Sequence, residues 1–240
     1  MLKMYLNIIF FVILVISTSS LGDKINITLI YSSADEQSLN FLKTEWTLKP
    51  IDVFEKYINW DLELYTPYTA KPNENGSRDY SFKCDHGEQE VLGNKYHECA
   101  KKYYFYKNDE LINFTKCYAK NTAVLSADTV KLPDLGLCTN DDNQRNYLKT
   151  CVEGRDVINS LVNSTSNIKK LKIEMKMPIL FVNGKRFDWN GKFNEFEKNM
   201  CQNISSINNL TDICNGAISN IFINIALLLS MLMFHKVMSY

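Results

Sequence analysis

Alternating apolar and polar positions predict two strands near the start of the chain. Isoleucine and leucine alternate with polar neighbours over residues 25–29, and a second alternating run, "NWDLELY", covers residues 59–65. Between them, Ser33 and Glu36 have the spacing of a capping box, so we expect a helix with Ser33 as its N-cap and a break near Pro50. A strand, a helix and a strand within about forty residues predict a βαβ unit whose strands are parallel.

The middle of the chain is polar and predicts helices. The stretch "KPNENGSRDYSF", residues 71–82, is rich in Pro, Gly, Asn and Ser and predicts a loop. A helix-like stretch that contains cysteines follows from Lys95 to about Thr165, with an interruption near Pro133. We therefore expect a helical insertion over about residues 95–170.

The last part of the domain predicts a β-hairpin and a closing helix. Residues 178–182 are apolar, and an Asn-Gly turn at 183–184 leads into a short return strand. Apolar residues at helical spacing then predict the helix: Phe193, Phe196 and Met200.

The order β-α-β, helices, β-β-α is that of an α/β, thioredoxin-like fold with a helical insertion. In such folds a cis-proline stands just ahead of a strand, and Met177-Pro178 occupies that place here. Pro178 is therefore the cis-proline candidate. An ordinary trans proline at the start of a strand is the alternative.

Apolar stretches at both ends predict targeting segments. Residues 1–22 have a positive start, an apolar core and small residues, as in a signal peptide; a retained signal anchor is the alternative. Residues 218–240 are expected to be a transmembrane anchor or a lipid-anchor signal, with a packed C-terminal helix as the remaining alternative. The domain between them, residues 23–217, would then lie in the secretory pathway, at the cell surface, secreted or in a lysosome-like compartment, attached to a membrane.

Charge and sequons fit a secreted protein that binds no nucleic acid. The 27 basic and 27 acidic side chains balance, whereas a nucleic-acid surface requires a basic stripe. Asparagine sequons predict glycosylation on an exposed surface. The candidates are Asn26, Asn75, Asn113, Asn163, Asn203 and Asn209.

Seven cysteines predict disulfides with one cysteine left over. Cysteines are normally paired in the secretory pathway, so an odd number leaves one thiol free or bonded to another chain. The candidates are Cys84, Cys99, Cys117, Cys138, Cys151, Cys201 and Cys214. A zinc site is the alternative for the ligand set Cys84, His86, His97 and Cys99, although an oxidising compartment disfavours free thiolates.

The stretch "CDHGEQEVLGNKYHEC", residues 84–99, resembles the signature of the gamma-interferon-inducible lysosomal thiol reductases, roughly C-x-H-G-x-x-E-C-x-x-N-x-x-x-x-C. "MPILFVNGKRF" is similar to the proline-strand-NGK segment of that family, and the resemblance covers about residues 25–214. It implies a disulfide-stabilised structural element here, with His86 and Glu90 lining or bracing the redox cleft. The matching positions are Cys84, His86, Gly87, Glu90, Asn94 and Cys99.

Two departures from the family pattern change the expected function. The middle cysteine of the signature is Val91 here. The redox C-x-x-C of the family starts the first helix, and aligning Tyr31 with the family's tyrosine places Asp35 and Ser38 at its two cysteine positions. The family pattern would contain ten cysteines, so the loss of these three leaves one without its former partner.

We therefore expect a degenerate thiol reductase that needs no cofactor and acts as a membrane-attached binding or surface protein with a polypeptide partner. Thiol-disulfide exchange requires an attacking sulfur, which the redox position lacks. A thiol-disulfide oxidoreductase that uses a single unpaired cysteine is the first alternative, and a zinc-stabilised module is the second.

Overall fold

The centre of the fold is a four-stranded sheet whose first two strands are parallel. In this computed structural model, β1 (Ile25–Tyr31) pairs with β2 (Ile58–Leu64) in parallel and with β7 (Ile179–Val182) antiparallel. β8 (Lys185–Phe187) pairs with β7, which gives the order β2-β1-β7-β8. The predicted βαβ unit and the predicted hairpin are both confirmed, as is the α/β class.

The structure describes residues 24–45, 58–73, 78–174, 176–192, 195–196, 198–200 and 202. The predicted signal peptide, the C-terminal apolar stretch, the break near Pro50 and position 193 of the closing helix lie outside them. Residues 195–196 and 198–200 of the expected closing helix are helical. Residues 25–197 form one compact unit.

Alternation along the strands separates a buried face from a partly open face. Ile25, Ile27 and Leu29 of β1 are fully buried, whereas Asn26 between them is exposed. β2 repeats the pattern, with Ile58, Trp60 and Leu62 buried. Successive strand residues point to opposite faces, so the alternation in the sequence becomes the two faces of the sheet.

After β1 the chain forms α2 (Glu36–Asn40), which continues into a turn of π-helix, η1 (Phe41–Glu45). Two aromatic rings pack against Phe41 of this segment. The ring of Phe41 lies 5.0 Å from that of Trp189 and 6.1 Å from that of Phe196, and both contacts are edge-to-face. Such pairs stabilise a core beyond the area that they bury.

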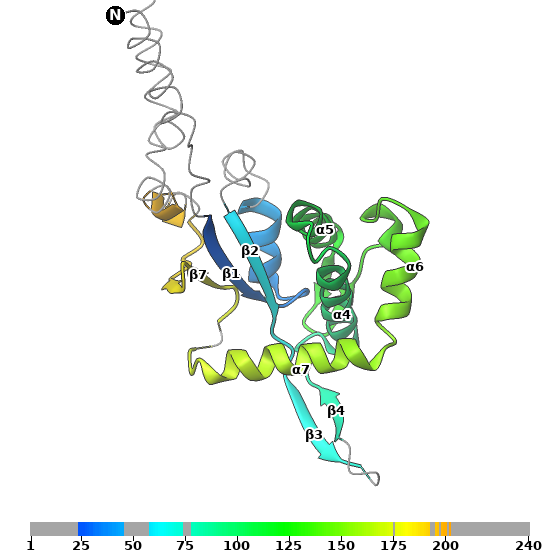
Figure 1. Cartoon of the computed structure of the whole chain (residues 1–240). Coiled ribbons are helices and arrows are strands. Elements are labelled where there is room, and N and C mark those ends of the chain that lie inside the picture. Colours follow the sequence, from blue (N-terminus) through cyan, green and yellow to red (C-terminus); the bar gives the residue numbers. More distant parts are fainter. Residues whose placement is uncertain are drawn as a thin grey trace, which may run out of the picture. The chain divides into compact units, whose positions relative to one another are not determined.

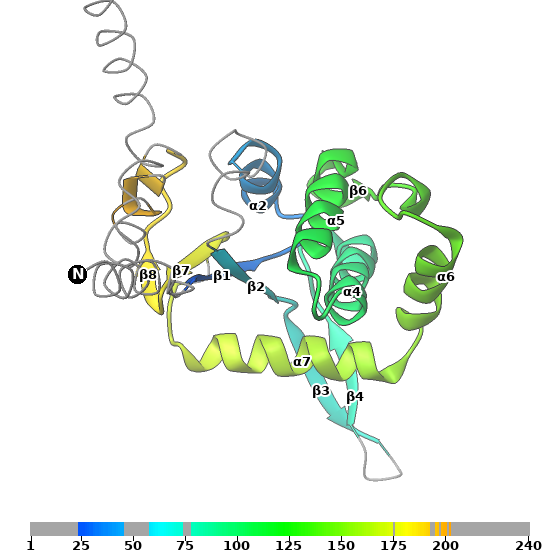
Figure 2. The same ribbon diagram turned by 45° about the horizontal axis from the view of Figure 1, so that its top comes forward.

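The chain between β2 and the first long helix contains a hairpin that the sequence did not predict. β3 (Tyr68–Pro72) and β4 (Arg78–Phe82) pair antiparallel. The hairpin points away from the sheet and the helices (Figures 1 and 2). The prediction of a loop is wrong for residues 71–72 and 78–82, because the ring of Tyr68 contacts those of Tyr80 and Phe82 across the two strands. Residues 74–77 lie outside the described residues.

The insertion contains four helices: α4 (Gly87–Tyr103), α5 (Asn108–Asn121), α6 (Asp142–Cys151) and α7 (Arg155–Lys170). It begins at residue 87, eight residues before the predicted 95. A small hairpin, β5 (Ala123–Ser126) and β6 (Thr129–Lys131), and a 3-10 turn, η3 (Leu135–Leu137), interrupt the helices after α5.

α7 returns from the helices to the sheet (Figures 1 and 2). Both α4 and α7 pack against β2, and α5 packs against η1. Ile168 of α7 forms a buried cluster with Ile30 of β1 and Ile179 of β7. The insertion is therefore joined to the sheet at the C-terminal ends of the parallel strands, where the chain passes from β1 into α2.

Candidate functional site

The candidate site begins where β1 passes into α2. The N-cap of α2 is Asp35, whose Oδ1 accepts a hydrogen bond from the backbone N–H of Ser38 at 2.7 Å. The prediction that Ser33 caps this helix is wrong. Its hydroxyl and backbone N–H bond to α4 instead, and Asp35 is a strong capping residue that stands directly before the first helical turn.

The two residues expected to align with the redox cysteines of the resembled family, Asp35 and Ser38, are the N-cap and a first-turn residue of this helix. Asp35 is half-buried, and Ser38 is fully buried. The Oγ atom of Ser38 has no hydrogen-bond partner among the residues that the structure describes. A carboxylate and a buried hydroxyl therefore stand at the helix start, and neither can form a mixed disulfide.

Glu90 joins the signature to the loop after β1. Gly87 has φ +63°, a left-handed conformation that favours glycine, at the start of α4. One carboxylate oxygen of Glu90 accepts from the backbone N–H of His86 at 2.9 Å and lies 3.2 Å from its Nδ1. The other accepts from the hydroxyl of Ser32, and the Glu90 side chain is only 7% exposed.

Asn94 makes the second connection and is fully buried. Its Oδ1 accepts from the backbone N–H of Ser33 at 2.8 Å, and its Nδ2 donates to the hydroxyl of Thr66 at 3.1 Å. The backbone N–H of Thr66 donates in turn to Thr165 of α7 at 2.9 Å. The signature helix thus stabilises the two loops at the C-terminal ends of β1 and β2.

A cleft lies beside the start of α2. The Met177–Pro178 peptide bond is cis, and Pro178 lines the cleft together with Gln37, which lies between Asp35 and Ser38 in the sequence. Its volume is about 80 Å³. Apolar and charged side chains share its walls: Met177, Ile179, Phe187 and Trp189 with Glu174, Lys176, Arg186 and Asp188.

The sequence of residues 26–141 matches the family described as gamma interferon inducible lysosomal thiol reductase. This range contains β1 from its second residue, the loop after it and the whole signature. Residues 26–141 belong to the gamma-interferon-inducible lysosomal thiol reductase family.

Two solved structures resemble the fold. The oxidised form of BdbD from Bacillus subtilis superposes with a TM-score of 0.51 at 9% identity, over 77% of this chain and 88% of that one. The thiol-disulfide exchange protein alpha-DsbA2 from Wolbachia pipientis has a TM-score of 0.45 at 11% identity, over 74% of this chain and 81% of that one. At 9% identity the likeness to BdbD concerns the fold alone, which is thioredoxin-like. No curated protein matches the chain.

The cysteines of this thiol reductase family member form two disulfides within the described residues. Cys99 of α4 bonds to Cys151 of α6, and Cys117 of α5 bonds to Cys138 after η3. Cys84 is free and half-buried, while Cys201 and Cys214 lie outside the described residues.

The free thiol of Cys84 is a poor nucleophile. Burial, together with the negative charges of Glu90 and Asp85, raises its pKa to about 12. The thiolate is the attacking species in disulfide exchange, so Cys84 stays protonated and unreactive at neutral pH. The raised pKa of Cys84 does not support the single-cysteine oxidoreductase alternative at this residue.

The zinc alternative is wrong for its four proposed ligands. The sulfur of Cys99 is bonded to Cys151 and cannot also bind a metal as a thiolate. His97 is buried in the core, where its Nδ1 lies 2.7 Å from the hydroxyl of Tyr31 and its ring lies 4.6 Å from that of Tyr118. No group of metal-binding side chains occurs in the described ranges.

Three of the six sequons lie on described residues. Asn26 is on β1, Asn113 on α5 and Asn163 on α7, and all three are exposed. They occupy exposed strand and helix positions. Asn75, Asn203 and Asn209 fall outside the described residues.

Sequence reasoning did not identify the partners of the signature residues. Ser32, Ser33 and Thr66 meet Glu90 and Asn94 only in the folded chain. Ser32 and Ser33, two consecutive polar residues directly after a predicted buried strand, could have indicated that this loop bonds to another segment. The cleft is also lined by Gln37, Arg186 and Trp189, which no sequence motif identified as site residues.

Proposed function

We propose that this family member binds an extended polypeptide in the cleft beside Pro178 and does not reduce disulfides at the start of α2. The observation that carries the proposal is the pair Asp35 and Ser38, which stands on an intact helix start where the family has its redox cysteines. The bonds from Glu90 and Asn94 to the preceding loop support a site whose surroundings are preserved.

The position of the two side chains supports loss of the chemistry. Unpaired N–H groups at a helix start lower the pKa of a thiol placed there, and this activates the family's nucleophile. Here one of those N–H groups, on Ser38, already donates to the Asp35 carboxylate. The Asp35 carboxylate thus occupies an N–H group at the helix start that could otherwise stabilise a thiolate.

The composition of the cleft supports a polypeptide as the ligand. Phe187 and Trp189 offer apolar surface, while Lys176, Arg186 and Asp188 provide charges at the same cleft. Such a mixture suits a chain with an apolar side chain between polar groups. Gln37, which lies between Asp35 and Ser38 in the sequence, lines this cleft, and this supports a ligand that binds beside the start of α2.

The place of action would be the secretory pathway, with attachment to a membrane through residues 218–240. The apolar run in that segment, the apolar N-terminal stretch and the usual lysosomal or secreted location of the family support this part of the proposal. Within the described part of the chain, no helix has the length and apolarity to span a bilayer.

Turnover of a denatured protein disulfide, measured at acidic and neutral pH, tests the chemistry. We expect no turnover above background for the natural chain and at least about tenfold more for the Asp35→Cys, Ser38→Cys variant, because the fold supplies the activating helix start. The matched control is Asp35→Asn, Ser38→Ala, which changes both positions without adding sulfur. Turnover by the natural chain equal to that of the cysteine variant would refute the proposal.

Binding is tested separately with a denatured polypeptide whose cysteines have been reduced and alkylated. We expect saturable binding that weakens at least about tenfold in Trp189→Ala, since an aromatic side chain in a pocket contributes strongly to affinity. Tyr106→Ala removes an aromatic side chain that is 92% exposed and outside the cleft, and should bind normally. Equal affinity for all three proteins would exclude this cleft as the binding site.

A further inference from the structure

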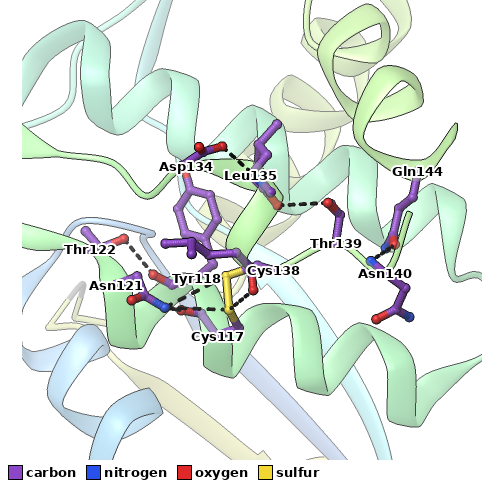
Figure 3. The surroundings of a disulfide bond; sticks show 12 residues. Cys117, Tyr118, Asn121, Thr122, Asp134, Leu135, Cys138, Thr139, Asn140 and Gln144 are labelled. Atoms are coloured by element: carbon purple, nitrogen blue, oxygen red, sulfur yellow. Dashed lines mark hydrogen bonds between the residues drawn. A yellow bond between two sulfur atoms is a disulfide. The ribbon is translucent and has the colours of Figure 1, made fainter. Parts of the chain in front are cut away.

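The two disulfides of the described residues lie in different surroundings. Cys99 is completely buried, and its partner Cys151 is half-buried. Cys117 and Cys138 are both half-buried, and the residues beside them, Asn121 and Leu137, are exposed. Figure 3 shows this second disulfide between α5 and the turn of η3. An external thiol can therefore approach it from solvent.

The amide of Asn121 points at this disulfide. Its Nδ2 donates to the backbone carbonyl of Cys117 at 2.9 Å, which fixes the side chain one helical turn from that residue. The same nitrogen lies 3.6 Å from Sγ of Cys117 and 4.0 Å from Sγ of Cys138, as the dashed lines in Figure 3 indicate. An amide nitrogen has two hydrogens, so one remains for the sulfurs.

This donor favours cleavage of the bond. When a thiolate attacks a disulfide, the departing sulfur takes the negative charge, and the rate rises as that charge is stabilised. The Asn121 amide is nearer to Cys117, so Cys117 is the better leaving group and Cys138 the sulfur under attack. The carbonyl oxygen of Leu137 lies 3.3 Å from Sγ of Cys117 and can accept from the thiol once it is protonated.

We propose that the Cys117–Cys138 disulfide is a thiol-exchange site that accepts two electrons from a dithiol. A thiolate of the dithiol attacks Sγ of Cys138, the bond between the two protein sulfurs breaks, and its electron pair goes to Sγ of Cys117. The second thiolate of the dithiol then displaces Cys138 from the mixed disulfide. The dithiol leaves as a disulfide, and the two protein sulfurs take up two protons.

The Cys99–Cys151 disulfide lacks these features. A thiolate left on Cys99 would be fully buried, and an uncompensated buried charge is strongly unfavourable. The proposed exchange is therefore specific to one of the two bonds. It uses neither Asp35 nor Ser38, so it is independent of the function proposed above.

The test exposes the full natural chain to graded dithiothreitol, blocks free thiols at intervals, and quantifies each disulfide by peptide-resolved mass spectrometry. We expect Cys117–Cys138 to open at least about tenfold faster than Cys99–Cys151 while the helical circular dichroism is unchanged. Equal rates for the two bonds, or opening only with loss of the helical signal, would overturn the proposal.

Variants of Asn121 test the role of its amide. Asn121→Asp replaces the donor by a negative charge and should slow the opening of Cys117–Cys138 about tenfold. Asn113→Asp makes the same change on an exposed position of α5, about 12 Å further along the helix, and should leave the rate unchanged. An unaltered or faster rate in Asn121→Asp would show that the amide has no such role. The rate at Cys99–Cys151 reports any general loosening of the fold.

Discussion

The backbone N–H of Ser33 donates to Oδ1 of Asn94 at 2.8 Å, although the two residues are 61 positions apart. This bond joins the loop that precedes α2 to α4, the helix of the family signature. Both residues are fully buried, so water cannot replace either partner. The signature therefore stabilises the loop that leads into α2.

Removal of the Asn94 side chain should destabilise the fold strongly. Asn94→Ala leaves the N–H of Ser33 and the hydroxyl of Thr66 without this partner, and we expect the free energy of unfolding to fall by about 2–3 kcal/mol. Denaturant titration followed by circular dichroism measures the change. Gln89→Ala, an exposed change on the same helix, should alter stability by less than about 0.5 kcal/mol. Similar losses in both variants would contradict the assigned role.

Gly93 should be intolerant of a side chain because α4 packs closely on the loop after β1. A Cβ atom at this position would lie 2.4 Å from Oγ and 3.2 Å from Cβ of Ser33. We expect Gly93→Ala to destabilise the protein by about 1–2 kcal/mol, although alanine is the better helix former.

A double-mutant cycle identifies the cause of that loss. In a Ser33→Ala background the nearest clash is absent, so Gly93→Ala should cost at least about 1 kcal/mol less than it does in the natural chain. If the two substitutions had additive effects on the free energy of unfolding, the loss in Gly93→Ala would not come from the contact with Ser33.

His97 should make the fold less stable in mild acid. Burial lowers its pKa from the ordinary value of 6.5 to about 3, so the folded protein keeps the imidazole neutral. Between these two pH values the unfolded chain binds the proton and the folded chain does not, and stability therefore falls as pH falls below 6.5. The contribution of His97 to this loss should reach about 2 kcal/mol at about pH 5.

Chemical unfolding at about pH 7.5 and pH 5 in His97→Gln and in the natural chain measures this contribution. The variant loses the titrating group, so its stability should change less between the two pH values. Tyr118→Phe removes a neighbouring buried hydroxyl that has no hydrogen-bond partner among the described residues, and should retain the natural pH dependence. A His97→Gln profile parallel to that of the natural chain would disprove the assignment.

Cys84 should resist alkylation in the folded protein. A pKa of about 12 leaves almost no thiolate at about pH 8, whereas an unperturbed cysteine is partly ionised there. We expect iodoacetamide to label Cys84 at least about a hundredfold more slowly in the folded than in the unfolded chain, as read by peptide-resolved mass spectrometry. Asp85→Asn removes one of the charges that raise the pKa and should speed the labelling, whereas Asp79→Asn on β4, which is not among the causes of this shift, should not. Fast labelling of the natural folded chain would show an activated thiol.

The sequence by itself determined the strands of the sheet, the hairpin after Pro178, the family and the lack of a C-x-x-C motif among the seven cysteines. These features depend on local patterns: alternation over a few residues, an Asn-Gly turn, and the residue types in one signature of sixteen positions. Each is complete within a short stretch of chain, so no distant partner is needed to read it.

Only the tertiary structure decided which residues complete the site. The capping box at Ser33 and Glu36 was a sound local pattern, but Ser33 bonds to Asn94 and Glu90, so Asp35 takes the cap. The disulfide partners and the proximity of Gln37 to Pro178 likewise depend on contacts between distant segments. Contacts between residues about 20 to 140 positions apart leave no periodic trace in the sequence, because the partners are brought together only when the helices and the sheet pack.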